Sequence, residues 1–243
     1  MTASMQRADI LLVARGLFDS RARAQAAIAA GLVRAAGKPV TKPSALLAPD
    51  AALSASAPHP YVSRGGVKLA AALEYFGLDP ANRVCLDVGA STGGFSEVLA
   101  LRNAARIYAV DVGHGQLHRR LQENPVIVSM EGRDARKLTA RDFEAPPTLI
   151  VFDASFISLR LLLPHVLSLA APDAQMVALI KPQFEAGRAA ARKGVVRDAA
   201  AQAKACEDTR ALLEALGWRV AGVIASPIEG GDGNREFLIG ASR

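Results

Sequence analysis

Four charged residues stand at positions where a charge is costly unless it is paired or used. Asp153 and Lys181 each come directly after an apolar run typical of a buried strand. Glu236 opens another such run, and Lys68 lies at the start of a predicted helix. A charge beside a buried strand is unfavourable unless it has a partner or a chemical task. We therefore treat all four as candidate catalytic residues, with a solvated surface charge as the alternative for each.

Two lysines and two carboxylates suit the activation of a weak nucleophile. A hydroxyl group attacks poorly until its proton is removed, and a neutral lysine amine can remove it. A second lysine nearby and partial removal from water both favour the neutral amine, whereas carboxylates hold the amines in place. Alignment of the attacking oxygen with the group to be transferred would supply much of the rate. These residue types therefore favour proton abstraction coupled to group transfer.

A glycine-rich segment, residues 87–95 (DVGASTGGF), follows a predicted strand and opens a predicted helix. The dinucleotide fingerprint requires glycine at the positions that Gly89, Ser91 and Gly94 occupy here. The middle glycine, which admits a pyrophosphate, is replaced. An adenosyl ligand without phosphates therefore fits better than NAD, and S-adenosylmethionine is the candidate cofactor. A purely structural turn is the alternative.

Acidic residues at the ends of neighbouring strands complete this candidate cofactor site. Asp111 ends the next strand and can accept hydrogen bonds from both ribose hydroxyls. Asp134 follows the third strand and can accept from the adenine amine, while Asp87 can reach the methionine ammonium. The predicted cofactor-binding residues are Asp87, Gly89, Ser91, Thr92, Gly93, Gly94, Phe95, Asp111, Asp134 and Asp153.

The elements that must position these residues alternate along the chain. Strands are predicted over residues 83–88, 106–111, 126–130, 148–152, 175–180, 219–225 and 236–240. Helices are predicted over residues 67–76, 95–102, 158–170 and 199–216. Apolar strands that alternate with helices indicate an α/β fold with a mostly parallel sheet covered on both faces. Only a turn separates the last two strands, which predicts an antiparallel hairpin at that end of the sheet.

The segment before this alternation, residues 1–60, follows a different pattern. Helices are predicted over residues 9–14 and 20–30, with Ser20 as the cap of the second, and a strand over residues 32–34. Residues 39–60 hold five prolines and predict a connection with one strand at most. We expect a small α+β domain with its linker over residues 1–60 and a larger domain over residues 61–243.

The positive charge of the chain is concentrated near the N-terminus. The net charge is +6, and residues 1–70 account for all of it, with nine Lys or Arg against three Asp or Glu. Such asymmetry indicates an anionic polymer as partner, with nucleic acid first and a membrane surface second.

Several classes of protein are disfavoured. No apolar stretch approaches the length of a membrane-spanning helix, and residues 1–10 lack the apolar core of a secretory signal, so we expect a cytoplasmic protein without a membrane partner. Cys85 and Cys206 fit no metal spacing. His114 and His118 lie four residues apart but have no third ligand nearby, so no metal site is predicted.

Five motifs in the same order resemble the TlyA family, bacterial 2′-O-methyltransferases of ribosomal RNA that are often labelled haemolysins. They are residues 61–69 (YVSRGGVKL), 87–95 (DVGASTGGF), 153–158 (DASFIS), 181–185 (KPQFE) and 233–237 (GNREF). The catalytic half is similar to methyltransferases of the FtsJ or RrmJ type. The N-terminal segment, residues 1–60, is similar to the small RNA-binding domain of ribosomal protein S4.

The resemblance implies a Rossmann-like class I methyltransferase with a seven-stranded sheet, S-adenosylmethionine as cofactor, and cytidine 2′-hydroxyls in rRNA of one or both ribosomal subunits as substrate. It implies a catalytic tetrad of Lys68, Asp153, Lys181 and Glu236, with Lys181 as general base. It does not predict an oligomeric state.

Basic residues in two regions are candidates for RNA contact. The segment between Glu185 and Asp198 follows Lys181 and is rich in arginine, so we expect it to hold RNA over the site. The predicted RNA-binding residues are Arg7, Arg21, Arg23, Lys38, Arg64, Arg188, Arg192 and Lys193. Two alternatives remain open: an RNA- or ribosome-binding protein with an inert methyltransferase fold, and a membrane-active haemolysin, which the short apolar stretches disfavour.

Overall fold

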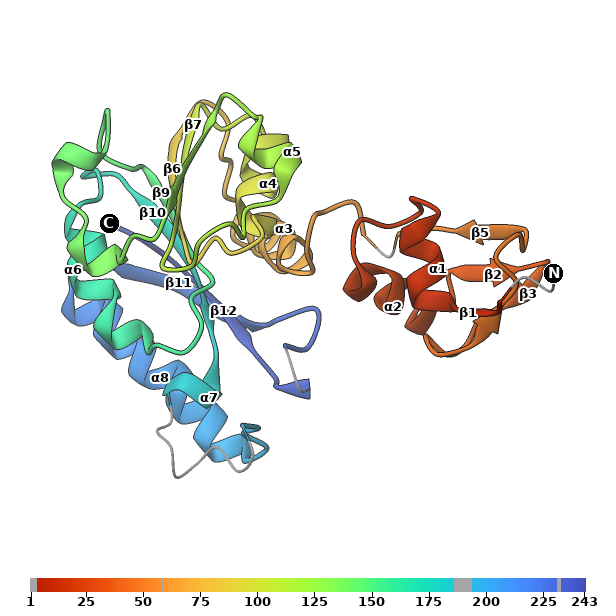
Figure 1. Cartoon of the computed structure of the whole chain (residues 1–243). Helices are drawn as coiled ribbons and strands as arrows, with labels where there is room; N and C mark the ends of the chain where they lie inside the picture. The colour runs from red at the N-terminus through yellow and green to blue at the C-terminus, as the bar shows by residue number, and fades with distance from the viewer. Residues whose placement is uncertain (1–3, 58, 186–193, 231–232) are drawn as a thin grey trace. The chain divides into compact units, whose positions relative to one another are not determined.

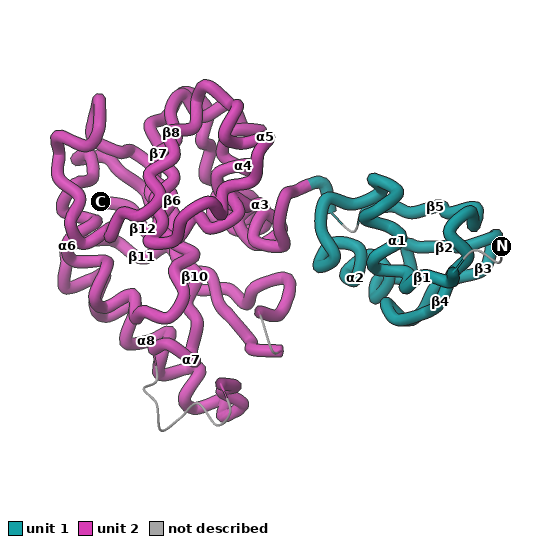
Figure 2. The backbone as a smooth tube through the Cα atoms, viewed as in Figure 1, with its two compact units in different colours: residues 1–60 teal, residues 61–243 magenta. Residues whose placement is uncertain are grey.

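The computed structural model describes residues 4–57, 59–185, 194–230 and 233–243. The chain divides into two compact units, residues 1–60 and residues 61–243 (Figure 2). Each unit has its own apolar core.

Unit 1 consists of two short helices packed on short strands. Helix α1 (Ala8–Ala14) and helix α2 (Arg21–Ala29) bury Leu12, Phe18 and Ile28 between them and the strands. Ser20 caps α2, because its hydroxyl accepts a hydrogen bond from the Arg23 amide, as predicted. The strands form two antiparallel sheets. The two-stranded sheet consists of β1 (Gln6–Arg7) and β4 (Leu46–Leu47). The three-stranded sheet has the order β3 (Lys38–Pro39), β2 (Val33–Ala35) and β5 (Leu53–Ala55).

The prediction of at most one strand over residues 39–60 was wrong. Both β4 and β5 lie in this region. They have two and three residues, which is too short for an alternating pattern to appear in the sequence.

Unit 2 is built on a seven-stranded sheet with the order β11-β12-β10-β9-β6-β7-β8. The strands are β6 (Val84–Val88), β7 (Arg106–Asp111), β8 (Ile127–Glu131), β9 (Leu149–Phe152), β10 (Gln175–Ile180), β11 (Arg219–Ala225) and β12 (Phe237–Ser242). The first five are parallel, and β12 is antiparallel to both of its neighbours. The predicted α/β fold and C-terminal hairpin are confirmed, and β12 enters between β10 and β11.

Helices cover both faces of this sheet (Figure 1). Helices α3 (Gly65–Phe76), α4 (Gly94–Leu101) and α5 (Arg119–Gln122) pack on one face, where Val177 and Leu179 of β10 also point. Helices α6 (Leu163–Ser168) and α8 (Ala199–Ala215) cover the other face, where Ala178 and Ile180 point. This two-residue alternation between two apolar layers is why the strands read as continuous apolar runs.

The single helix predicted over residues 158–170 is in fact two elements. A 3-10 helix, η3 (Leu159–Leu161), is followed by α6, and Pro164 lies in the first turn of α6. Proline has no amide hydrogen and starts helices better than it continues them, so it separates the two. Four further short elements of unit 2 were not predicted because they span only three or four residues: α5, η1 (Ala135–Lys137), η2 (Ala140–Asp142) and α7 (Pro182–Glu185).

The strand register places four loops at one edge of the sheet. Val88 pairs with Phe152, and Ala178 pairs with Phe152 on the other side, so Gly89 and Asp153 leave the sheet together. Ile180 pairs with Phe237 in the antiparallel partner. Lys181 follows Ile180, and Glu236 precedes Phe237. Both residues therefore lie at the same edge of the sheet. Among the described residues, no helix has both the length and the apolar character needed to cross a membrane.

Candidate active site

Two lysine–carboxylate pairs meet at this edge of the sheet. Lys68 Nζ lies 2.5 Å from Glu236 Oε2, and Lys181 Nζ lies 2.8 Å from Asp153 Oδ1. Lys68, Asp153 and Lys181 line the same cavity of about 260 Å³. Residues up to 168 positions apart in the sequence are thus brought together.

Three of these four side chains are well buried. Lys68 and Lys181 are each 7% exposed and Glu236 is 4% exposed, while Asp153 is partly buried. Charges held this far from water need close partners, since an isolated buried charge costs several kcal/mol. Each lysine has such a partner in one of the two carboxylates.

Glycines of two elements bring the backbone close to these pairs. Gly89 has φ +86°, and a methyl group in place of its hydrogen would lie 2.7 Å from Ala154 Cα. A methyl group on Gly65, at the start of α3, would lie 3.2 Å from Asp153 Oδ2. Any larger residue at Gly89 would therefore strain the backbone and displace the loop that follows β9.

Asp111 and Asp134 border the larger of two adjoining cavities. The Asp111 carboxylate accepts hydrogen bonds from the amides of Ser91 and Gly113, both at 2.8 Å, which fixes the glycine-rich loop against the end of β7. Asp134 is held by the Arg136 side chain and amide, and these hydrogen bonds lower its pKa to about 2. Asp134 is thus an ionised acceptor at the cavity wall, and Asp111 is already an acceptor for two backbone amides there.

Asp87 carries a buried oxygen that has no partner within the described residues. Its Oδ2 accepts a hydrogen bond from Ser96 at 2.7 Å, whereas Oδ1 has none. Burial, and to a lesser extent the nearby charges of Asp153 and Asp111, raises the pKa of Asp87 to about 7 despite the Ser96 bond. A buried carboxyl group with an unsatisfied oxygen is unfavourable unless a ligand supplies a donor, preferably a cationic one.

Two adjoining cavities share the residues of the glycine-rich loop. The larger has a volume of about 580 Å³ and is bordered by Asp111, Asp134 and Phe156. Gly89, Ser91, Asp153 and Ser155 line both this cavity and the smaller one that holds the lysines. An elongated ligand can therefore extend from the acidic residues of the larger cavity to the ion pairs. The remaining predicted cofactor residues Thr92, Gly94 and Phe95 line the smaller cavity, and Gly93, at φ +93°, precedes α4.

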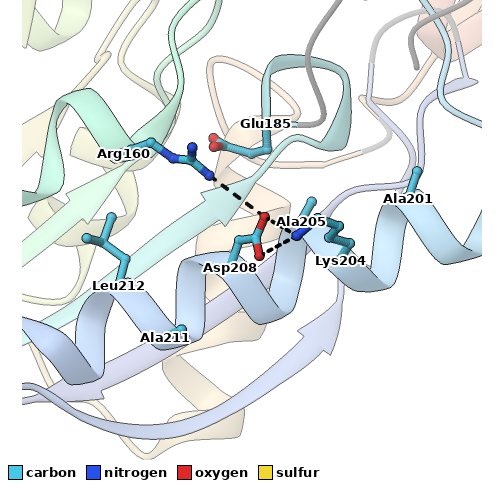
Figure 3. A pocket seen from close by; sticks show the side chains of 8 residues that line it. All are labelled: Arg160, Glu185, Ala201, Lys204, Ala205, Asp208, Ala211 and Leu212. Atoms are coloured by element: carbon cyan, nitrogen blue, oxygen red, sulfur yellow. Dashed lines mark hydrogen bonds and ion pairs between the residues drawn. The ribbon is translucent and has the colours of Figure 1, made fainter. Parts of the chain in front are cut away.

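A third cavity of about 660 Å³ lies apart from this loop, beside α8 (Figure 3). Asp208 is paired there with Lys204 at 2.9 Å and with Arg160 at 3.7 Å. Glu185 accepts from Ser158 and from the Leu159 amide at the start of η3. The acidic groups are thus already engaged with neighbours, so we place the candidate site at the glycine-rich loop instead.

The predicted RNA-binding residues fall into several environments. Arg7 and Arg21 both bind the fully buried Asp9, whose pKa is lowered mainly by the Arg7 hydrogen bond. Arg23 pairs with Asp19. The others are placed as follows: Lys38 is exposed in β3, Arg64 is exposed at the smaller cavity, and Arg188, Arg192 and Lys193 lie outside the described residues.

Three residues at the site had no role in the sequence analysis. Ser155 accepts a hydrogen bond from Lys181 at 2.7 Å, and Ser96 donates one to Asp87. Glu97 is buried in α4 and accepts from the Val62 amide at 2.5 Å, which ties the segment before α3 to the glycine-rich loop. Ser155 stands within a motif and could have been noticed, but no spacing marks Ser96 or Glu97.

Among the described residues, no group of three or more His, Cys, Asp or Glu side chains has the geometry of a metal site. Cys85 and Cys206 are free thiols, and burial raises the pKa of Cys85 to about 12. A high pKa keeps this thiol protonated and unreactive.

Phe156 is unusual in both exposure and backbone conformation. Its exposed fraction is 92%, and its φ is 63°. Residues other than glycine rarely adopt such a positive φ. Its ring lies 5.3 Å from that of Phe184. An exposed ring held in a strained conformation beside Asp153 and Ser155 offers an apolar platform at the mouth of the site.

Comparison with known proteins shows the family to which the chain belongs. Residues 61–243 match the model of FtsJ-like methyltransferases, and residues 6–52 match that of S4 domains. The 16S/23S rRNA (cytidine-2′-O)-methyltransferase TlyA of Mycobacterium tuberculosis is 43% identical over 240 residues, which cover 98% of this chain and 90% of the relative. Hemolysin A of Brachyspira hyodysenteriae is 36% identical, over 96% of this chain and 98% of the relative.

A solved structure of a hemolysin-named protein from Streptococcus thermophilus is similar over the whole length. It has a TM-score of 0.79 and 39% sequence identity, and the match covers 99% of this chain and 89% of that one. The order of the two domains along the chain therefore has a close counterpart. The chain belongs to the TlyA family of rRNA methyltransferases, in which an S4 domain precedes an FtsJ-like methyltransferase domain.

Proposed function

We propose that this protein transfers a methyl group from S-adenosylmethionine to the 2′-hydroxyl of a cytidine ribose in ribosomal RNA. The observation that carries the proposal is the meeting of two lysine–carboxylate pairs at a cavity that adjoins the glycine-rich loop. A ribosomal RNA substrate would also place its action in the cytoplasm.

The cofactor fits the residues that line the two cavities. Asp111 would accept from the ribose hydroxyls and Asp134 from the adenine amine in the larger cavity. Asp87 is buried and lines neither cavity, and its unpartnered oxygen would take the methionine ammonium, directly or through water. When bound, the cofactor supplies an electrophilic methyl group on a positively charged sulfur. Gly89 lets the glycine-rich loop pack against the backbone of Ala154, which borders the larger cavity.

The tetrad would then act on the ribose. Lys181 serves as the base for the 2′-hydroxyl proton, and Asp153 holds its amine in position. Lys68, fixed by Glu236, is a second donor at the same cavity and would orient the ribose oxygens. Fixing the attacking oxygen in line with the methyl group removes much of the entropic barrier.

RNA would be held mainly by charge. Unit 1 carries basic side chains and the buried Asp9, which orients Arg7 and Arg21 so that their remaining N–H groups can reach phosphates. Phosphate contacts release counterions, so RNA affinity should fall steeply as salt rises. Phe156 would stack on the target base after that base has left the RNA helix.

The test is the mapping of 2′-O-methyl groups in rRNA treated with the protein and S-adenosylmethionine. Lys181→Ala and Asp153→Ala should lose methyl transfer while they keep most of their affinity for S-adenosylhomocysteine. Lys204→Ala, which removes an exposed lysine from the cavity beside α8, is the matched control and should remain active. Methylation by Lys181→Ala at the native rate would overturn the mechanism, and absence of methylation by the native protein would favour an inert RNA-binding fold.

A further inference from the structure

Lys181 is surrounded by three hydrogen-bond acceptors, and only one of them can also donate. Its Nζ lies 2.8 Å from Asp153 Oδ1, 3.1 Å from the Asp153 carbonyl oxygen and 2.7 Å from Ser155 Oγ. The contacts with the Asp153 carbonyl oxygen and with Ser155 are hydrogen bonds, and the contact with the Asp153 carboxylate is an ion pair. Carboxylate and carbonyl oxygens only accept, whereas a serine hydroxyl both accepts and donates.

These contacts determine where the lone pair of a neutral Lys181 points. A neutral amine keeps two hydrogens and one lone pair in the same tetrahedral positions. A lone pair aimed at either oxygen of Asp153 would face another lone pair, which is repulsive. The favoured arrangement donates both hydrogens to Asp153 and directs the lone pair at Ser155 Oγ, and the Ser155 hydroxyl then reverses and donates to Lys181.

Ser155 is also more accessible to a substrate than Lys181. It is exposed and lines both cavities, whereas the lysine side chain is only 9% exposed and is enclosed by its partners. A substrate hydroxyl in the cavity can therefore reach Ser155 Oγ while Lys181 keeps its contacts with Asp153.

We propose that Ser155 relays the proton of the ribose 2′-hydroxyl to Lys181, an inference that rests on the proposed function. The methyl carbon–oxygen bond forms as the carbon–sulfur bond breaks, and the electron pair of the broken bond goes to sulfur. The 2′-hydroxyl proton moves to Ser155 Oγ, and the proton already on Ser155 moves to Lys181 Nζ. The positive charge passes from the sulfonium to the lysine, so charge and atoms balance.

The first test measures binding without cofactor. An rRNA fragment that contains the mapped target is compared with the same fragment carrying 2′-deoxyribose at that nucleotide. The native protein should bind the ribose form roughly three- to tenfold more tightly, which corresponds to one hydrogen bond. Ser155→Ala should lose this discrimination and Ser155→Thr, which keeps a hydroxyl, should retain it. Undiminished discrimination in Ser155→Ala overturns the relay.

The second test measures single-turnover methyl transfer. Ser155→Ala should be slower by about 100-fold or more, the usual contribution of a proton-transfer group, whereas Ser155→Thr should stay within about tenfold of native. Affinity for S-adenosylhomocysteine should remain within about twofold in both variants, as expected for an intact fold. If Ser155→Ala does not fold, the rate of the native enzyme in mixtures of H₂O and D₂O decides instead. Two protons in motion give a curved dependence on the deuterium fraction, and a linear dependence overturns the relay.

The two variants distinguish the relay through Ser155 from the role of Lys181 as the base. If Lys181→Ala is inactive while Ser155→Ala transfers methyl groups at the native rate, Lys181 takes the proton directly and only the relay is wrong. If Lys181→Ala is as active as native, the proposed role of Lys181 fails and the relay fails with it.

Discussion

Replacing Asp87 with asparagine removes the charge of this carboxyl and keeps its shape, and the effect should depend strongly on pH. Burial raises the pKa of Asp87 from 3.8 to about 7 in the folded protein. The folded state therefore holds the proton more tightly than the unfolded state. The stability that this group contributes is complete below pH 3.8 and is lost as pH rises toward 7.

The magnitude follows from these two pKa values. Between pH 5 and pH 8, ionisation of Asp87 should cost the cofactor-free native protein about 2–3 kcal/mol of unfolding free energy. The Asp87→Asn variant does not lose this free energy of unfolding. The Tm of the variant minus the Tm of the native protein should therefore increase by about 5–10 °C from pH 5 to pH 8 for a domain of this size.

Thermal unfolding of both proteins at the two pH values measures this effect. Asp173→Asn, which removes an exposed carboxylate, is the control and should show no comparable change between pH values. Ligand affinity should move in the opposite direction. If Asp87 binds the ammonium of the cofactor as proposed, S-adenosylhomocysteine needs the ionised carboxylate, so native affinity should fall by up to about 30-fold from pH 8 to pH 5.5. The same Tm difference at pH 5 and pH 8 would refute the reasoning.

Three further changes have defined outcomes. Gly89→Ala should destabilise the protein by about 1–3 kcal/mol in denaturant unfolding and weaken S-adenosylhomocysteine binding, because φ is +86° and the added methyl group would meet the loop after β9. Asp9→Asn should weaken the hydrogen-exchange protection of α1 and α2 by about 2–3 kcal/mol and lower RNA affinity, because Arg7 and Arg21 lose their buried partner. Phe156→Gly should gain about 1 kcal/mol of stability, because glycine relieves the positive φ, and should bind rRNA more weakly because the ring is lost.

A specific result would contradict each of these three predictions. Normal cofactor binding by Gly89→Ala would mean that the loop can move aside at little cost. Unchanged exchange in α1 after Asp9→Asn would mean that the arginines do not depend on its charge. For Phe156, a tyrosine variant keeps the ring and should keep RNA affinity, so equal affinities of the glycine and tyrosine variants would remove the stacking role.

The strands of unit 2 could be predicted closely because each of the central ones is buried on both faces. The apolar run before Gly89 and the one before Lys181 end where the structure ends β6 and β10. The fold class, the hairpin and the common edge of the candidate residues follow from such runs. Two-residue strands such as β4, and the break at Pro164, depend on neighbours that are distant in sequence and leave little local pattern.

The partners within the site could not be predicted in the same way. The pairing of Lys68 with Glu236, and of Lys181 with Asp153, depends on strand order and register rather than on spacing. The unsatisfied oxygen of Asp87 is a property of burial, which only the packed structure defines. Asp9 stands within a helix, and its role as a common partner of two arginines depends on the fold of α1 against α2.

The position of β12 between β10 and β11 has a consequence for how unit 2 matures during translation. Residues 237–242 pair with both neighbours, so neither β10 nor β11 can complete its hydrogen bonds until this segment has left the ribosomal exit tunnel. Unit 1 has its own core within residues 1–60 and can fold long before that point. A nascent chain would therefore display a finished basic unit while its larger unit still lacked Glu236 and an interior strand. A premature stop codon in this region would leave β10 with an open edge and β11 without a partner strand, and both would be prone to aggregation.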